Sequence, residues 1–379
     1  MSAKSILIEA TPATDNHKTG IGYYVDNMLI TLNNSKIAKN YTIFYYNFLG
    51  KNKFKNPYNN LRTVTVKFTP AKLIGVFKKF GSLPYIDVFV KKSYKFILYT
   101  NYVALPSINK TPYGIIIYDM GFLDKPQYIQ QKNLNYLQSF APKTIKNASL
   151  IVTISDFTKE RILHYYPNIK AKIIVTPIPA KSIKYDDNKI GNSTQNTKYI
   201  LAVGTLEPRK NYKNLVLAYC RLPQNIKDKY QLIVAGVNGW DNKELLLLVK
   251  EKQNRGNNIK LTGYVTDQEL KKLYKDASVF IMPSHYEGFG MPLLEAMQNN
   301  LPMAISDIKV FHEIAQDSAI YFNKDDPNDI ANNLTKLINS PDIQKQNISR
   351  YAKILSSYSW ENNISLIDTA INDLLKERN

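Results

Sequence analysis

The chain has 379 residues, of which 44% are hydrophobic and 12% aromatic; this is enough apolar material for two packed cores and excludes a globally disordered protein. Its formal net charge is +19, from 50 Lys and Arg against 31 Asp and Glu, which suits a nucleic acid, an acidic membrane surface or a phosphorylated small molecule as partner. A single cysteine, Cys220, excludes an internal disulfide, and no segment has the ~20 continuous apolar residues of a membrane-spanning helix.

The first half of the chain begins like a nucleotide-binding α/β domain. An apolar strand over 4–10 precedes a polar loop that contains Gly20 and Gly22, and a helical pattern follows over 23–32. Further predicted strands lie at 41–48, 94–99, 113–118, 150–154 and 171–175, and a helix is predicted over 156–166. We therefore predict a Rossmann-like domain over residues 1–180.

The second half repeats the alternation of strands and helices. A stretch rich in Asp, Asn, Ser, Thr and Lys, 181–198, is the predicted linker. The strands that follow are predicted at 199–203, 231–235, 259–261, 279–282 and 302–305, with helices at 214–221, 242–253, 266–277 and 292–299. We predict a second doubly wound parallel sheet over 199–357, and a last helix, within 358–379, that crosses back to the first domain.

Two carboxylates, Glu287 and Glu295, flank a glycine-bearing turn between a predicted strand and a predicted helix. Gly288 and Gly290 let a ligand approach the backbone amides, and a helix N-terminus attracts a diphosphate. The carboxylates would repel phosphate but accept hydrogen bonds from sugar hydroxyls. The pattern favours a ligand with phosphate in the middle and polyols at both ends, such as a nucleotide sugar. Capping of its own helix by Glu295 is the structural alternative.

Two shorter runs follow other predicted strands. Gly204 permits a tight turn, and the adjacent cations Arg209 and Lys210 can neutralise a leaving diphosphate. An ordinary exposed basic loop fits these residues equally well. After the strand at 259–261, Tyr264 and Val265 offer a ring and backbone groups to a base.

Together, the Glu-x7-Glu run, the Gly-Thr-Leu-Glu-Pro-Arg-Lys-Asn run and the Gly-Tyr-Val turn resemble the retaining GT-B glycosyltransferases of family 4. The resemblance extends through nearly the whole second half and is looser in the first half, where Thr19–Tyr23 and Ile154–Lys159 carry it. It implies an α/β GT-B fold, in which two Rossmann-like domains face a central cleft. The first domain would lie on the acceptor side, and the second would bind the nucleotide sugar.

The resemblance also implies a role for individual residues. Arg209 and Lys210 would hold the diphosphate, Glu287 would bind donor-sugar hydroxyls, and Glu295 would accept bonds from the ribose. Asp119 would contact the sugar or the attacking hydroxyl, although Tyr118 stands where many members of the family have a histidine. The other donor-binding residues would be Gly20, Gly22, Gly204, Tyr264, Val265, Gly288, Phe289, Gly290, Met291 and Leu293.

The implied reaction moves a sugar, with retention of configuration, from a nucleotide diphosphate donor to an acceptor hydroxyl. The Thr-Leu-Glu-Pro-Arg-Lys-Asn form looks closest to bacterial O-antigen mannosyltransferases, which suggests GDP-mannose and a lipid-linked saccharide acceptor in cell-envelope polysaccharide synthesis. Because an Asp-x-Asp motif is absent from the sequence, no metal or other cofactor is expected. A nucleotide-sugar 2-epimerase and a basic nucleic-acid-binding protein are the rival functions, but no nucleic-acid-binding signature supports the second.

A basic and aromatic stretch lies between Lys72 and Lys95. Its lysines and aromatic rings would suit the surface of an anionic membrane, and an ordinary surface helix is the alternative. The apolar run near the N-terminus is too short for a signal-peptide core. We therefore expect a cytoplasmic protein that is peripheral on the inner face of the membrane.

Overall fold

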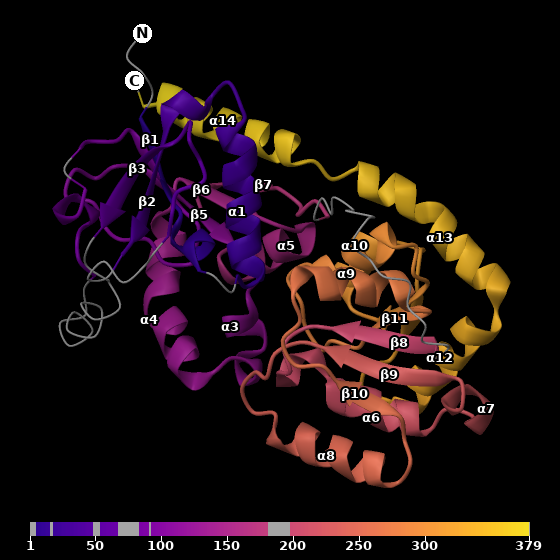
Figure 1. Ribbon diagram of the computed structural model, residues 1–379. Coiled ribbons are helices and arrows are strands. Elements are labelled where there is room, and N and C mark those ends of the chain that lie inside the picture. The colour runs from indigo at the N-terminus through magenta and orange to yellow at the C-terminus, as the bar shows by residue number, and fades with distance from the viewer. Residues whose placement is uncertain are drawn as a thin grey trace. The chain divides into compact units, whose positions relative to one another are not determined.

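The computed structural model describes residues 5–15, 18–47, 54–66, 83–90, 92–180 and 198–378. The chain forms two compact units, and each has a parallel sheet of its own (Figure 1). The first unit comprises Met1–Leu123, Gln131–Ile178 and Ser359–Asn379, and the second comprises Asp124–Gln130 and Pro179–Tyr358. Of the predicted linker, only Lys198 is described. Of the stretch between Lys72 and Lys95, residues 72–82 and 91 lie outside the described residues.

The first unit is built on seven parallel strands. They are β1 (Ile6–Glu9), β2 (Tyr41–Tyr46), β3 (Arg62–Val66), β4 (Phe96–Tyr99), β5 (Tyr113–Ile117), β6 (Leu150–Thr153) and β7 (Lys172–Val175), in the order β3-β2-β1-β4-β5-β6-β7. Every residue of β1, β4 and β6 is buried, as expected for a parallel sheet with both faces covered. The chain order reverses between β1 and β4, and ligands of such sheets bind beyond the carboxyl ends of the strands at this point.

Helices cover this sheet and connect its strands. They are α1 (Gly20–Asn33), α3 (Gly121–Asp124), α4 (Gln131–Asn147), α5 (Asp156–Tyr165) and α14 (Trp360–Lys376), with short 3-10 turns at Thr11–Thr14, Ala38–Asn40 and Ile86–Val88. The last helix, α14, belongs to the first unit. Its Trp360 packs edge to face on Tyr24 of α1 at 5.1 Å, and the hydroxyl of Tyr41 donates to Asp368 at 2.6 Å.

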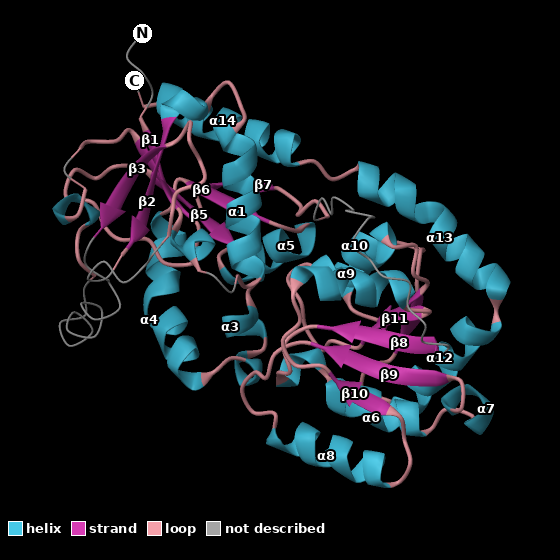
Figure 2. Ribbon diagram, in the orientation of Figure 1, coloured by secondary structure: helices cyan, strands magenta, loops and turns pink. Residues whose placement is uncertain are grey.

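The second unit contains six parallel strands in the order β10-β9-β8-β11-β12-β13. They are β8 (Lys198–Val203), β9 (Tyr230–Ala235), β10 (Ile259–Leu261), β11 (Val279–Met282), β12 (Met303–Ser306) and β13 (Ile320–Phe322). The helices are α6 (Tyr212–Cys220), α7 (Gln224–Lys227), α8 (Lys243–Asn254), α9 (Asp267–Asp276), α10 (Met291–Gln298), α11 (Lys309–Ala315), α12 (Pro327–Asn339) and α13 (Pro341–Ser356). In Figure 2, α9 and α10 lie on one side of the sheet and α6 and α8 on the other.

The predicted fold class, α/β with two doubly wound parallel sheets, is confirmed. The strands β3 and β13 and the helices α4, α11, α12 and α13 add elements that the sequence patterns did not indicate. Among the residues that the structure describes, no helix combines the length and the apolar character that crossing a membrane requires.

Candidate functional site

The loops that follow β8 and β11 meet at the carboxyl edge of the second sheet. These two strands pair with each other, and the chain order of the sheet reverses between them. The loop after β11 carries Glu287, whose carboxylate lies between two cations of the other loop. Arg209 Nη1 donates to Glu287 Oε2 at 2.5 Å, and Lys210 Nζ donates to Oε1 at 2.6 Å. The structure thus brings together three of the four predicted catalytic residues at a position typical of ligand binding.

The loop after β8 owes its shape to a short 3-10 turn, Pro208–Lys210, which ends at Asn211 in a left-handed conformation with a φ of 58°. The Asn211 side chain donates to the carbonyls of Pro283 at 3.0 Å and Lys324 at 2.7 Å. In the opposite direction, the amide of His285 donates to the carbonyl of Arg209 at 2.8 Å. Because these hydrogen bonds join the loops, they hold the cations and the carboxylate in register.

Burial and charge act in opposite directions on Glu287 and Lys210, each of which is 7% exposed. Burial alone raises the pKa of the Glu287 carboxyl, but Arg209 and Lys210 outweigh it and lower this pKa to about 2. Burial lowers the pKa of Lys210, and the attraction of Glu287 compensates only in part. Arg209 is 29% exposed at its side chain and also pairs with Glu207 through Nε at 2.6 Å. Arg209 is therefore the cation that an approaching anion would meet first.

A glycine is required at position 204 because of the lysine that passes over it. The φ of Gly204 is +148°, and a Cβ atom there would lie 2.9 Å from the hydroxyl of Tyr212 and 3.2 Å from Cε of Lys210. Such a φ is unfavourable for a side chain, and the space is already filled. Gly204 thus keeps the lysine stem close to the backbone, in addition to allowing the predicted turn.

The turn before α10 has the glycine-dependent form that the sequence predicts. Gly290 is the N-cap, with a φ of +128°, and α10 begins without a side-chain cap. Phe289 is buried against Tyr358, so its backbone rather than its ring remains for a ligand. The amide of Leu293 already donates to the carbonyl of Gly290 at 2.9 Å. A phosphate that binds the Leu293 amide would therefore have to share or displace that bond. Met291 lies at the first position of the helix, where the backbone amide has no partner within the helix itself.

Glu295 lies on α10 and accepts a hydrogen bond of 2.7 Å from the hydroxyl of Tyr274 on α9. This bond joins two helices on the same side of the sheet and gives the carboxylate a partner outside its own helix. The predicted base-binding residues follow β10: Tyr264 is 60% exposed and Val265 half-buried, directly after Gly263 with a φ of +69°.

The predicted site residues of the first unit lie at the carboxyl edge of its own sheet. Gly20 and Gly22 form the first turn of α1, where a Cβ on Gly22 would lie 2.7 Å from the carbonyl oxygen of Pro12. Asp119 follows β5 and accepts from the amide of Gly121 at 2.8 Å. Tyr118 is buried and donates its hydroxyl to the carbonyl of Thr100 at 3.0 Å. The residue at the expected histidine position is thus part of the core.

The sequence analysis did not anticipate several contacts around the site. Ser284 donates to Oε1 of Glu287 at 2.8 Å and is completely buried. The segment Asp124–Gln130 belongs to the second unit, where Tyr128 stacks on His285 with ring centroids 5.3 Å apart. Asp124 accepts from the hydroxyl of Tyr286 at 3.0 Å. Only the Ser284 contact could have been suspected, from its spacing of three residues to Glu287.

Comparisons with known proteins place the second half of the chain in a family. Residues 184–354 match the family model described as glycosyl transferases group 1. The chain is 30% identical over 252 residues to the O-antigen chain mannosyltransferase B of Escherichia coli, which covers 65% of this chain and 66% of that protein. It is 27% identical over 279 residues to the O-antigen chain mannosyltransferase RfbU of Salmonella typhimurium, 73% of each chain. The chain thus spans just under two thirds of the first relative's length.

A solved structure extends the likeness to the fold of the whole chain. Sucrose-phosphate synthase from Thermosynechococcus elongatus superposes with a TM-score of 0.75 over 99% of this chain and 100% of that chain, at 16% identity. At that identity the likeness concerns the fold alone. The family match covers the loops that hold Arg209, Lys210 and Glu287. The chain therefore carries, over residues 184–354, a domain of the glycosyl transferases group 1 family.

Proposed function

We propose that this chain is a retaining glycosyltransferase that moves mannose from GDP-mannose to a hydroxyl of a lipid-linked saccharide during the synthesis of a cell-envelope polysaccharide. The observation that carries the proposal is the Glu287 carboxylate clamped between Arg209 and Lys210 at the switch point of the second sheet. The names of the two mannosyltransferase relatives support the choice of sugar and pathway.

In the proposed reaction, the bond from the anomeric carbon to the diphosphate breaks while the acceptor oxygen bonds to that carbon on the same face. The acceptor proton passes to an oxygen of the departing diphosphate. Negative charge therefore grows on the leaving group, and stabilising it is the main task of the site. Arg209 and Lys210 would do this. Their side-by-side position, with one nitrogen of each on the Glu287 carboxylate, supports the assignment of both cations to one site.

Glu287 would then serve two purposes. In the structure its oxygens accept from Arg209, Lys210 and Ser284. A carboxylate has about four acceptor positions, so about one remains for a donor-sugar hydroxyl. The same group thus orients the cations and would bind the sugar. Glu295, fixed by Tyr274, would receive the ribose hydroxyls.

We propose that the reaction needs no divalent metal, because the two basic side chains supply the charge that a metal would otherwise provide. Turnover should then persist in excess EDTA, and a strict requirement for Mg²⁺ or Mn²⁺ would contradict this part of the proposal. We also propose that the enzyme acts from the cytoplasmic side, at the surface of the membrane. Flotation with anionic vesicles tests whether the protein binds such a surface.

The decisive experiment measures transfer from GDP-mannose, and from UDP-glucose and UDP-N-acetylglucosamine, to lipid-linked saccharide from envelope extracts. Arg209→Ala and Glu287→Ala should each abolish most turnover while the circular dichroism spectrum stays unchanged. Lys213→Ala is the matched control, because Lys213 pairs with Glu244 at the surface and its side chain is 56% exposed. Near wild-type turnover of both site variants would refute the site assignment.

The same assay separates the proposal from its rivals. Consumption of the nucleotide sugar without any acceptor would indicate an epimerase instead. Strong retention of RNA or DNA on a filter at physiological salt would indicate a nucleic-acid-binding protein. NMR of the isolated product reports whether the anomeric configuration is retained.

A further inference from the structure

A short segment from the first half of the chain lies against the loop that carries Glu287. Asp124–Gln130 belongs to the second unit, although the chain before and after it belongs to the first. It leads from the end of α3 to α4 and contains the 3-10 turn Pro126–Tyr128. The reaction proposed above gives this segment no task, yet two of its side chains contact residues next to Glu287.

The residues that precede Glu287 hold Arg209. The amide of His285 donates to the carbonyl of Arg209 at 2.8 Å, and Nη1 of Arg209 donates to the carbonyl of Tyr286 at 3.3 Å. The same Nη1 donates to the carboxylate of Glu287 at 2.5 Å. Three consecutive residues therefore fix both the backbone and the guanidinium of this cation.

The side chains of the same two residues contact the segment Asp124–Gln130. The ring of Tyr128 stacks on the ring of His285, with centroids 5.3 Å apart and an angle of 6° between the ring planes. The hydroxyl of Tyr286 donates to Oδ2 of Asp124 at 3.0 Å. The segment thus contacts the loop at the two positions whose backbone groups hold Arg209.

The loop depends on contacts of this kind because it has no regular structure of its own. Residues 283–290, between β11 and α10, form neither helix nor strand. Burial lowers the pKa of His285, and the attraction of Asp325, whose Oδ1 lies 3.2 Å from Nδ1, offsets this only in part. The ring is therefore neutral at neutral pH, and parallel rings at this separation attract each other.

We propose that Asp124 and Tyr128 are positioning residues for the transfer reaction proposed above, on which this inference rests. Each acts through its partner on the loop, and together they keep the guanidinium of Arg209 aligned with the departing diphosphate. Groups that are fixed before the reaction stabilise the charge of a transition state best, because they need not reorganise. Misplacing a group by about 1 Å can cost about a hundredfold in rate.

The first test compares two variants of Tyr128 in the transfer assay with the full chain. Tyr128→Ala removes the stacked ring and should lower kcat at least about tenfold, while the KM for the nucleotide sugar changes by less than about threefold. The reason is that Arg209 remains available to bind the donor but is no longer aligned for the transition state. Tyr128→Phe keeps the ring and should retain most of the wild-type kcat.

Asp124 allows the same comparison with a different contact. Asp124→Ala removes the acceptor of the Tyr286 hydroxyl and should lower kcat, whereas Asp124→Asn keeps an acceptor oxygen and should restore most of it. These variants decide the question by the same criteria if Tyr128→Ala destabilises the second unit as a whole.

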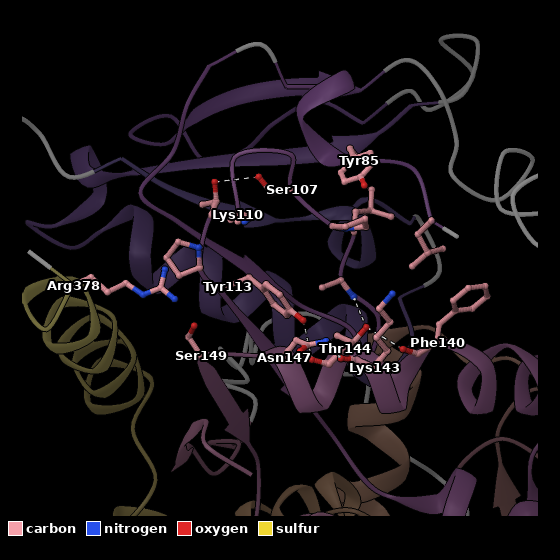
Figure 3. A pocket seen from close by; sticks show the side chains of 16 residues that line it. Tyr85, Ser107, Lys110, Tyr113, Phe140, Lys143, Thr144, Asn147, Ser149 and Arg378 are labelled. Carbon is pink, nitrogen blue, oxygen red and sulfur yellow. Dashed lines mark hydrogen bonds between the residues drawn. The ribbon is translucent and has the colours of Figure 1, made fainter. Parts of the chain in front are cut away.

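Tyr85→Ala is the matched control, because it removes an exposed tyrosine ring from the first unit. Figure 3 shows Tyr85 and Tyr113 at the cavity that they line. Tyr113 is the first residue of β5, so this cavity lies at the amino ends of the strands, whereas Asp119 follows the carboxyl end of β5. Tyr85→Ala should therefore leave both kcat and KM unchanged.

Hydrogen exchange tests the positioning without any substrate. Tyr128→Ala should speed exchange of the His285 amide about two- to tenfold and leave the amides of β9 unchanged, and Tyr128→Phe should exchange like the wild type. Faster exchange in β9 as well would reveal a general loss of stability. A wild type that transfers no sugar from any donor refutes the proposed function alone, and exchange at His285 then decides whether the segment holds the loop.

Three results would overturn the inference. One is a wild-type kcat in both Tyr128→Ala and Asp124→Ala. The second is exchange of the His285 amide that does not respond to loss of the Tyr128 ring. The third is a Tyr128→Phe variant as slow as Tyr128→Ala, because the stacked ring would then not be what positions the loop.

Discussion

Replacing Glu287 with glutamine keeps the size of the side chain and removes its charge from between Arg209 and Lys210. The pKa of this carboxyl is lowered from 4.5 to about 2 in the folded chain. At about 1.4 kcal/mol per pKa unit, this corresponds to about 3 kcal/mol of stability at neutral pH. The variant also leaves Lys210 buried without a carboxylate, which should lower the pKa of that lysine further. We expect Glu287→Gln to destabilise the second unit by about 3 kcal/mol at pH 7.

The pH dependence follows from the direction of the shift. Because the folded-state pKa is depressed, the stabilisation by Glu287 is complete above about pH 4.5 and is lost as the pH falls toward 2. The wild type should therefore lose stability over this window more steeply than the glutamine variant. Calorimetry gives the unfolding transitions, and hydrogen exchange of amides in β8 and β11 reports on the second unit directly.

A surface pair provides the control for this experiment. Glu244 pairs with Lys213, but its side chain is 80% exposed, and Glu244→Gln should leave the transition unchanged. If Glu287→Gln unfolds at the same temperature and with the same pH dependence as the wild type, the ion pairs at the candidate site do not stabilise the fold, and the electrostatic reasoning is refuted.

Three further substitutions test the geometry of the site. Gly204→Ala should lower the free energy of unfolding by about 1–3 kcal/mol and lower turnover, because it strains the backbone and displaces Lys210. Gly256 also has a positive φ but has open space around it, so Gly256→Ala tests the backbone strain alone. Equal losses of stability in urea denaturation would contradict the role of crowding at Gly204. Arg209→Lys cannot contact both Glu207 and Glu287 and should raise the KM for the nucleotide sugar about tenfold; an unchanged KM would exclude a two-carboxylate anchor. Tyr274→Phe removes one hydrogen bond, so stability should fall by about 1 kcal/mol and donor binding in calorimetry should weaken.

Apolar runs in the sequence were sufficient to predict the central strands, because a strand that is buried on both faces of a parallel sheet consists of nearly continuous apolar residues. The elements that escaped prediction lack this signal. The edge strand β3 is largely exposed and alternates polar and apolar residues, and β13 has only three residues. The helix α4 contains Pro142 and few buried side chains, which hides its helical pattern.

The residues of the site were visible in the sequence, but their contacts were not. Glycine-bearing turns after predicted strands identified Gly204 and Gly290, and both adopt positive φ. Glu287 is separated in the sequence from Lys210 by 77 positions and from Arg209 by 78, so these ion pairs depend on how the loops after β8 and β11 meet. Assigning Glu287 to sugar hydroxyls alone therefore left out the cations that it holds. The bond from Tyr274 to Glu295 depends in the same way on the packing of α9 against α10.

The place of α14 in the first unit has a consequence for biosynthesis. A ribosome makes the chain from the N-terminus, so most of the first unit emerges before Pro179, while the helix that completes it begins only at Trp360. At about 5–20 residues per second, the intervening chain takes roughly ten to thirty-five seconds to synthesise. Throughout that delay Tyr24 and Tyr41 lack their partners on α14, and the nascent protein presents an uncovered patch to chaperones.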